Sequence, residues 1–234
     1  MVKLSVLKVS KSAAFFFLAT FFLVPIAYSQ TEKIKYSDFL PLAYTSNFKK
    51  SVQTNFDGVG KVDGEKISTN FLTKQDAGVL SSFKNKQWTK VKISANGLYG
   101  DASFNVTLVH LYDLKSKLKT YEIFVEDETT KKYEWKIIPT LLTLGQAVEV
   151  GGYKETNNKD KLIATANISY LITKIKSGYE FCEIENIQNL ETGESEVIEE
   201  CDLFSNEKKL IGARSKVKIG NSAEFLVVGK STLK

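Results

Sequence analysis

The chain has 234 residues, of which 43% are hydrophobic, 25% charged and 12% aromatic, and its formal net charge is +5. This composition is that of an ordinary globular protein and excludes collagen-like, low-complexity and wholly disordered chains. It does not by itself indicate a function.

The first segment has the three parts of a secretory signal peptide. Three lysines precede an uncharged and mostly apolar run at residues 12–31, and Ala-Tyr-Ser ends at Ser29 with small residues at the −3 and −1 positions of a cleavage site. We therefore predict a signal peptide at residues 1–29. An uncleaved membrane anchor is the alternative, since about 20 apolar residues can span a bilayer.

Removing residues 1–29 takes away three lysines and leaves a net charge of +2. No later stretch approaches the roughly 18 apolar residues of a membrane helix, so we predict an exported chain without a stable membrane span, in the periplasm or at the cell surface. We expect one β-rich domain at 30–234, within which 30–86 could form a separate α+β portion.

Two short amphipathic helices are expected near the start of the mature chain. Ser46–Phe56 carries Phe or Val at every fourth residue, and Asp76–Lys84 is the second candidate. The glycine-rich stretch Asp57–Gly64 lies between them and is expected to form turns.

From Trp88 onward, short runs rich in Val, Ile, Thr, Tyr and Phe alternate with polar residues, which is the pattern of strands. Turns are expected at Asn96-Gly97, Gly151-Gly152 and Asn157–Asp160. About ten strands at regular spacing predict an all-β fold, mainly an antiparallel β-sandwich or a barrel-like sheet. The expected strands lie at 88–95, 104–108, 121–125, 133–137, 147–150, 162–173, 179–190, 196–204, 213–219 and 223–228.

Cys182 and Cys201 are the only cysteines and lie almost symmetrically about Thr192-Gly193. Thiols of an exported chain oxidise and persist as disulfides, so we predict a cross-strand disulfide in a β-hairpin. A redox pair would favour Cys-x-x-Cys, and a structural zinc site needs four ligands.

The same hairpin is strongly acidic. Between Ser177 and Glu207 there are ten acids and no Lys or Arg. This charge can form a docking surface for a basic partner, a neighbouring subunit or Ca²⁺, or it can be the solvated face of an edge hairpin that resists aggregation. The candidate partner-binding residues are Glu183, Glu185, Glu196, Glu199, Glu200 and Asp202.

The basic residues point to few functions. Arg214 is the only arginine, and bidentate recognition of bases and phosphates relies on Arg, so no nucleic-acid partner is predicted. The lysines at 115, 117, 119, 131 and 132 are expected to form a solvated face, with an anionic surface or acidic glycan as the alternative.

No catalytic, metal or cofactor site is predicted. His110 is the only histidine and is expected to be structural or at the surface, and no Gly-x-Ser-x-Gly motif is present. A pair of carboxylates for glycoside hydrolysis is not excluded, because sequence does not show their spacing.

No motif identifies a family. The leading hypothesis is a non-catalytic exported β-protein that binds an envelope or surface component through strand edges, aromatic patches and the acidic hairpin. The alternatives are a carbohydrate-binding or carbohydrate-cleaving protein and a structural subunit of a surface assembly. The sequence predicts no particular oligomeric state.

Overall fold

The computed structural model describes residues 32–39, 51–62, 64–136, 139–220 and 223–233. The predicted signal peptide lies outside these ranges. No helix among the described residues has the length and apolar character needed to cross a bilayer.

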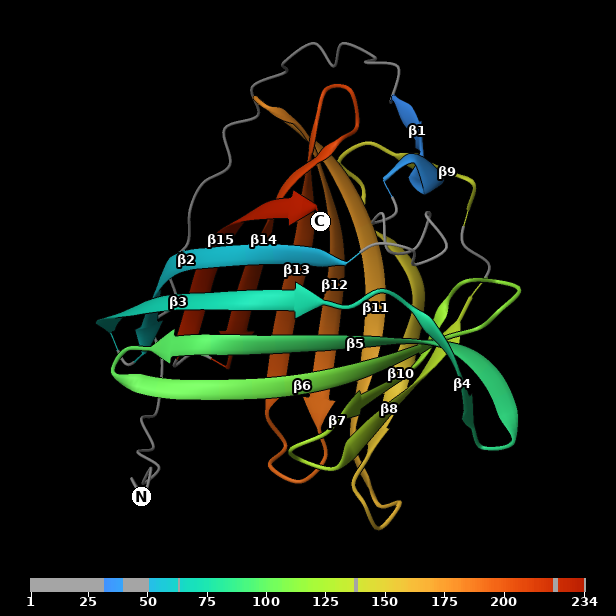
Figure 1. Ribbon diagram of the computed structural model, residues 1–234. Helices are drawn as coiled ribbons and strands as arrows, with labels where there is room; N and C mark the ends of the chain where they lie inside the picture. The colour runs from blue at the N-terminus through green and yellow to red at the C-terminus, as the bar shows by residue number, and fades with distance from the viewer. Residues whose placement is uncertain (1–31, 40–50, 63, 137–138, 221–222, 234) are drawn as a thin grey trace, which may run out of the picture. The chain divides into compact units, whose positions relative to one another are not determined.

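One antiparallel sheet accounts for most of the described chain (Figure 1). Its strands are β2 (Val52–Val62), β3 (Glu65–Gln75), β4 (Val79–Phe83), β5 (Lys86–Tyr99), β6 (Ala102–Tyr112), β7 (Lys119–Phe124), β8 (Thr129–Trp135), β10 (Val148–Thr156), β11 (Leu162–Ile175), β12 (Gly178–Asn189), β13 (Ser195–Ser205), β14 (Leu210–Ile219) and β15 (Ala223–Leu233).

Pairing between β3 and β5 closes this sheet into a barrel. The neighbours run β3-β2-β15-β14-β13-β12-β11-β10-β8-β7-β6-β5, and residues 69–75 of β3 then pair with residues 93–99 of β5. The result is a 12-stranded antiparallel β-barrel. The predicted all-β fold is thus confirmed as a barrel, and β4 remains outside the closed ring as an extension paired with β5.

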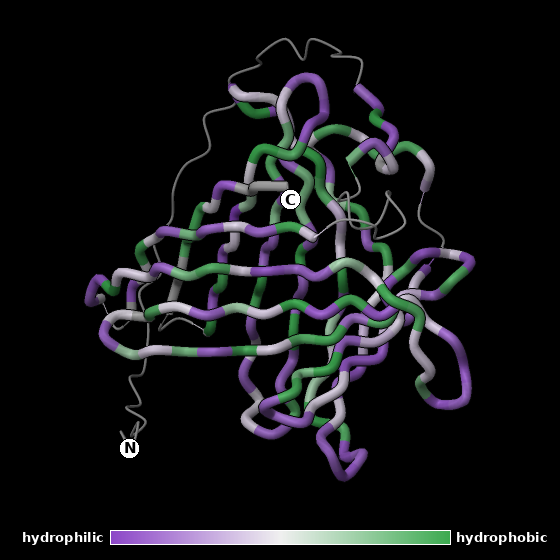
Figure 2. The backbone as a smooth tube through the Cα atoms, viewed as in Figure 1, coloured by the Kyte–Doolittle hydropathy of each residue, from purple (hydrophilic) through white to green (hydrophobic). Residues whose placement is uncertain are grey.

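The period of two along each strand decides which residues face the barrel interior. On β13, Phe204 packs in the core while the neighbouring Leu203 faces the other way. Hydrophilic and hydrophobic residues are interspersed along the strands of the wall (Figure 2). A 12-stranded barrel is wider than the 8-stranded barrels that side chains can fill, so its interior has room for more than a close-packed core.

An apolar plug packs inside one end of the barrel. β1 (Lys33–Lys35) pairs with β9 (Leu141–Thr143), and the short 3-10 turn η1 (Tyr36–Asp38) follows β1. Phe39 is fully buried, with its ring 5.2 Å from that of Tyr179 and 5.4 Å from that of Phe204. The plug therefore packs against the inner faces of β8 and β10 to β13, at the end where β12 begins and β13 ends. We call the opposite end, beside the β12–β13 turn, the mouth.

The predicted helices are not present among the described residues. Asp76–Lys84 contains β4 instead, because Lys84 and Asn85 both adopt positive φ, as a two-residue hairpin turn requires, and return the chain as β5. Of the predicted helix Ser46–Phe56, residues 52–56 belong to β2 and residues 46–50 lie outside the described ranges.

Several predicted turns are strand interiors. Asn96-Gly97 lies within β5, where a side chain on Gly97 would collide with Phe71, and the rings of Phe71 and Phe104 meet from the two flanking strands at 5.8 Å. Gly151-Gly152 lies within β10 at a register shift. Residues 57–62 of the glycine-rich stretch Asp57–Gly64 belong to β2. The predicted turn at Asn157–Asp160 is confirmed.

The predicted disulfide is confirmed. Cys182 and Cys201 are directly opposite each other on β12 and β13, with Cα atoms 4.0 Å apart. Both are nearly inaccessible to water. The bond therefore links the middle of the β12–β13 hairpin in the barrel wall.

Replacing both cysteines by alanine should lower the free energy of unfolding by about 3 kcal/mol, because closing a loop of this length restricts the unfolded chain. Urea unfolding of the oxidised wild type and of Cys182→Ala/Cys201→Ala measures the difference. Equal stabilities of the two proteins would contradict the expected role of the bond.

Candidate functional site

The closed barrel divides the acidic hairpin between two faces. Register places five of the six candidate partner-binding residues on the inner face, namely Glu183, Glu185, Glu196, Glu200 and Asp202. Glu199 alone lies on the outer face, beside Arg214. β12 and β13 are both paired on each side, so the hairpin is not at a sheet edge. Docking of a partner on these six residues stays a prediction.

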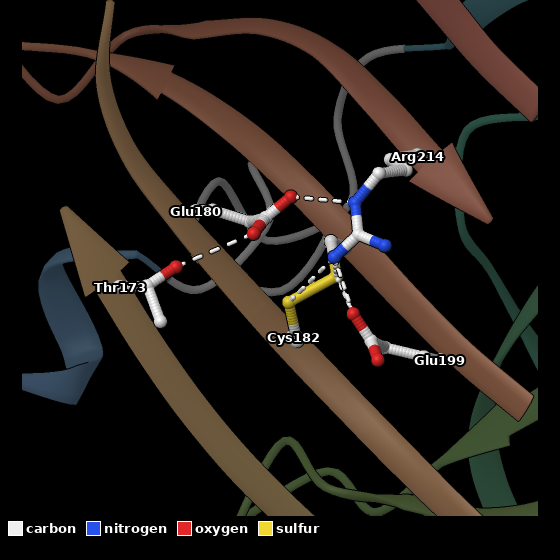
Figure 3. The surroundings of a disulfide bond; sticks show 6 residues. Thr173, Glu180, Cys182, Glu199 and Arg214 are labelled. Carbon is white, nitrogen blue, oxygen red and sulfur yellow. Dashed lines mark hydrogen bonds and ion pairs between the residues drawn. A yellow bond between two sulfur atoms is a disulfide. The ribbon is translucent and has the colours of Figure 1, made fainter. Parts of the chain in front are cut away.

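On the outer face, Arg214 covers the disulfide (Figure 3). Its Nε atom donates to Glu180 Oε1 at 2.7 Å, and an Nη atom pairs with Glu199 and lies 3.1 Å from Cys201 Sγ. The fork of two carboxylates around one guanidinium explains why this position carries the only arginine. The rarity of arginine was the signal in the sequence that could have marked this residue.

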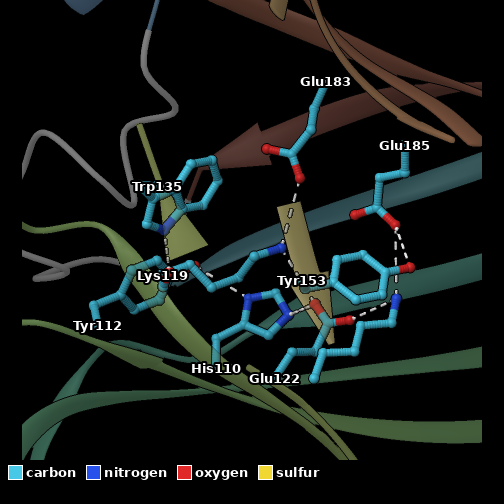
Figure 4. Close-up of polar contacts among 9 residues, drawn as sticks. His110, Tyr112, Lys119, Glu122, Trp135, Tyr153, Glu183 and Glu185 are labelled. Atoms are coloured by element: carbon cyan, nitrogen blue, oxygen red, sulfur yellow. Dashed lines mark hydrogen bonds and ion pairs between the residues drawn. The ribbon is translucent and has the colours of Figure 1, made fainter. Parts of the chain in front are cut away.

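On the inner face, Glu122 of β7 is the centre of a buried charge network (Figure 4). His110 Nε2 and Lys119 Nζ lie 2.8 and 3.3 Å from Glu122 Oε2, and Lys131 Nζ lies 3.2 Å from Oε1. Tyr112 extends the network through a 3.1 Å contact between its hydroxyl and His110 Nδ1. One carboxylate is therefore surrounded by side chains from β6, β7 and β8.

The two lysines connect this centre to the acidic hairpin. Lys119 Nζ lies 3.7 Å from Glu183 Oε1 and 4.4 Å from the centre of the Tyr133 ring. Lys131 Nζ lies 3.7 Å from Glu185 Oε2, which also accepts a hydrogen bond from the Tyr153 hydroxyl at 3.1 Å. These contacts bridge the inner faces of β7, β8, β10 and β12.

The positions of Lys119 and Lys131 correct an expectation from the sequence. Both were expected on a solvated face, but both are buried, with 6% and 7% of their surface exposed. Alternation along β8 gives the reason, since Lys131 shares the inner face with the buried Tyr133 while the exposed Lys132 lies on the outer face. His110 is buried in the network and not at the surface, and a purely structural role for it stays a prediction.

Burial and the neighbouring charges together determine which side chains of the network are ionised. Burial opposes ionisation of Glu122, but Lys119 and Lys131 outweigh it and hold the pKa of this carboxyl well below its usual range. Burial lowers the pKa of His110 despite its contact with Glu122, so its imidazole is neutral at pH 7. Glu122 is thus an anion held by two ammonium groups.

The acids deeper in the hairpin lack such compensation. Desolvation by the surrounding barrel wall, followed by repulsion between neighbouring carboxylates, raises the pKa of Glu200 and of Asp202 to about 7, although the Glu200 side chain still meets water in the interior. The pKa of Glu183 also rises to about 7, where burial outweighs the opposing effect of Lys119. Glu183 and Glu200 are directly paired across β12 and β13, an arrangement of like charges that destabilises a sheet.

A cavity of about 250 Å³ lies at the mouth of the barrel. Its lining comes from strands on half of the ring, β7 through β14, and includes both apolar and charged side chains. Deeper on β13 and β14, the inward-facing Glu200 is exposed and Ser215 half-buried, so open space continues past the cavity. The lining residues used below are Phe124, Lys131, Tyr153, Ala164, Glu196 and Ile198.

One group of potential metal ligands lies close together among the described residues. Glu180, Cys182 and Cys201 form this group, and the two sulfur atoms are already bonded to each other. No three inner carboxylates of the described residues come as close to one another. The inner face presents carboxylates, ammonium groups and aromatic rings, which can hold a molecule by charge, hydrogen bonding and aromatic contact.

Replacing Glu122 by Gln should lower the free energy of unfolding by about 3–5 kcal/mol, because it leaves two buried ammonium groups without their shared anion. Chemical denaturation measures the loss. In the double variant Glu122→Gln/Lys131→Met the loss should be smaller than the sum of the two single losses. Additive losses would show that the two side chains are not coupled.

Replacing Glu200 by Gln should stabilise the barrel at pH 8 and have no such effect at pH 5. The pKa of Glu200 is raised from 4.5 to about 7, so its folded form loses stability as the pH rises through that interval, and Gln removes the loss. The charged groups acting on Glu200 are Glu185, Lys119, Glu122 and Lys131, together with the paired Glu183.

We expect Glu200→Gln to raise the free energy of unfolding by about 1 kcal/mol at pH 8. This is less than the full pKa shift would give, because the Glu200 side chain still meets water. Thermal unfolding at the two pH values measures it. Glu134→Gln, on the exposed outer face of β8, is the matched control and should give equal effects at both. A destabilised Glu200→Gln at pH 8 would contradict the electrostatic account.

Comparison with known proteins gives no match to a family model, a curated protein or a solved structure. The function is therefore argued from the site alone. Its defining features are an apolar plug at one end of the barrel, a cavity at the other end and an excess of carboxylates between them.

Proposed function

We propose that this chain is an exported, non-catalytic binding protein that holds a small polar ligand inside its barrel. The single observation that carries the proposal is the cavity at the mouth, which is lined by inward-facing charged and aromatic side chains. Ligand sites are concave and combine apolar walls with a few convergent polar groups. The disulfide is compatible with the predicted export.

The shape of the interior supports binding within the barrel. The buried plug around Phe39 occupies part of one end, and the cavity lies at the other, so we expect a ligand to enter at the mouth. Lys131 and Tyr153 form part of the cavity lining and are held in place by Glu122 and Glu185. A site whose polar groups are already fixed loses little entropy when a ligand binds.

A second candidate function is binding of an envelope protein at β4, in line with the expectation of recognition through a strand edge. Among the described residues β4 pairs only with β5, so its other edge is unpaired. Val79 and Leu80 are 59% and 73% exposed on this strand. An incoming extended segment could add to such an edge through main-chain hydrogen bonds.

Native mass spectrometry of the chain purified from its own envelope fraction tests the first proposal. We expect the wild type to carry an additional small mass, and Ala164→Phe, which fills the cavity, to lose it while unfolding at a similar temperature. Thr165→Phe is the matched control, because the adjacent residue faces outward, and should keep the mass.

A wild type without any added mass, or an Ala164→Phe variant that keeps it, would contradict binding in the barrel. In-cell cross-linking of the same protein separates the second candidate. A protein adduct that is lost in Leu80→Lys, with no small mass in the barrel, would favour the β4 edge instead.

A further inference from the structure

The inner face carries a line of carboxylates that extends away from the mouth. Glu196, Glu200 and Asp202 share the inner face of β13, and Glu183 of β12 is paired with Glu200. Alternate residues of a strand are roughly 6.6 Å apart, so these acids extend over several such steps along the barrel wall. We call Glu183, Glu196, Glu200 and Asp202 the acidic track.

Apolar residues are interleaved with the acids of the track. Ile198 lies between Glu196 and Glu200 on β13, while Ile187 is opposite Glu196 and Phe181 is opposite Asp202. The wall thus alternates between carboxylates, which attract positive charge, and apolar side chains, on which methylene groups can pack. A ligand matching this wall has cationic groups separated by short apolar segments.

The track lacks counter-charges of its own. Within the part of the chain that the structure describes, no ion pair is formed by Glu196, Glu200 or Asp202, and Glu183 shares Lys119 with Glu122. Repulsion from neighbouring carboxylates contributes to the raised pKa of Glu200 and Asp202. A bound cation would relieve this repulsion.

The cavity already contains one ammonium group, which belongs to the protein. Lys131 Nζ is held by Glu122 and Glu185 and lies 5.1 Å from the centre of the Phe124 ring and 4.5 Å from that of Tyr153. Carboxylates and aromatic faces together are the usual surroundings of bound ammonium groups. The same cavity extends from Lys131 to Glu196 and Ile198 on the acidic track.

A buried hydroxyl adds a second indication beside the track. Tyr133 is 3% exposed, and its hydroxyl has no hydrogen-bond partner among the described residues. Glu122, Glu183 and Glu185 are near enough to act on it electrostatically. Buried polar groups are normally paired in native proteins, so an unpaired one next to the acids is consistent with a missing ligand.

We propose that the ligand of the barrel is a linear polyamine, whose ammonium groups bind the acidic track and whose methylene segments pack on Ile187 and Ile198. This inference rests on the proposed function. A metal ion fits less well, because no three inner carboxylates of the described chain come within coordinating distance of one another. An anion would meet the same uncompensated acids and be repelled.

Isothermal titration calorimetry of the mature chain at pH 8 and low salt tests the proposal, with spermidine as the probe. We expect saturable binding of spermidine and none of butane-1,4-diol, a neutral molecule with the same four-methylene segment. Glu200→Gln and Asp202→Asn should each weaken binding at least tenfold. Glu134→Gln, which removes one acid from the exposed outer face, should leave the affinity unchanged and so control for attraction by net charge.

The polyamine proposal would be overturned if spermidine failed to bind, or if it bound the wild type and Glu200→Gln equally. It would also be overturned if calcium chloride bound the same carboxylates with higher affinity than spermidine. The proposed function is tested apart from this. If the wild type in native mass spectrometry still carries another molecule that Ala164→Phe loses, binding in the barrel stands and only the class of ligand is wrong.

Discussion

Pairing of β3 with β5 is the constraint on which the rest of the structure depends. It joins the two ends of the sheet, so that every strand of the ring has one face inside a closed wall. Closure removes most of the free strand edges that an open sandwich would have. Among the described strands of this sheet, β4 pairs with a neighbour on one side only. Closure also commits every second residue of the acidic hairpin to the interior, where charge is costly unless it is paired.

The buried charges of the barrel are not all compensated to the same degree. Around Glu122, two lysines and a neutral histidine satisfy the buried charge and tie β6, β7 and β8 to the hairpin. Around Glu200 and Asp202 no cation within the described residues plays that part, and the pKa of each rises to about 7. A structural network thus lies beside an incompletely neutralised surface. Stabilisation explains the first, and our proposal assigns the second to the binding of a ligand.

Local signals predicted much of the fold. Alternation marked most strands after Trp88, and the symmetry of Cys182 and Cys201 about a turn predicted both hairpin and disulfide. The turn predicted at Asn96-Gly97 was wrong. Asn-Gly is typical of a turn, but here Gly97 lies within a strand, where the absence of a side chain leaves room for Phe71 and Phe104 on the flanking strands. The charge network was not predictable, because whether Lys131 faces water depends on which face closure encloses, and that depends on pairings distant in sequence.

The central claim is that the interior is open at the mouth and negatively charged. Because the only two cysteines are bonded to each other, a Ser215→Cys variant has one reactive thiol, on the inner face opposite Glu200. The most direct test of the claim is to measure how fast a cationic and an anionic methanethiosulfonate reagent modify this thiol. The same two rates are measured for the outer-face variant Lys218→Cys as a comparison. The account predicts that Ser215→Cys reacts, and that it favours the cationic reagent more strongly than Lys218→Cys does. A thiol that fails to react, or equal preferences at the two positions, would contradict it.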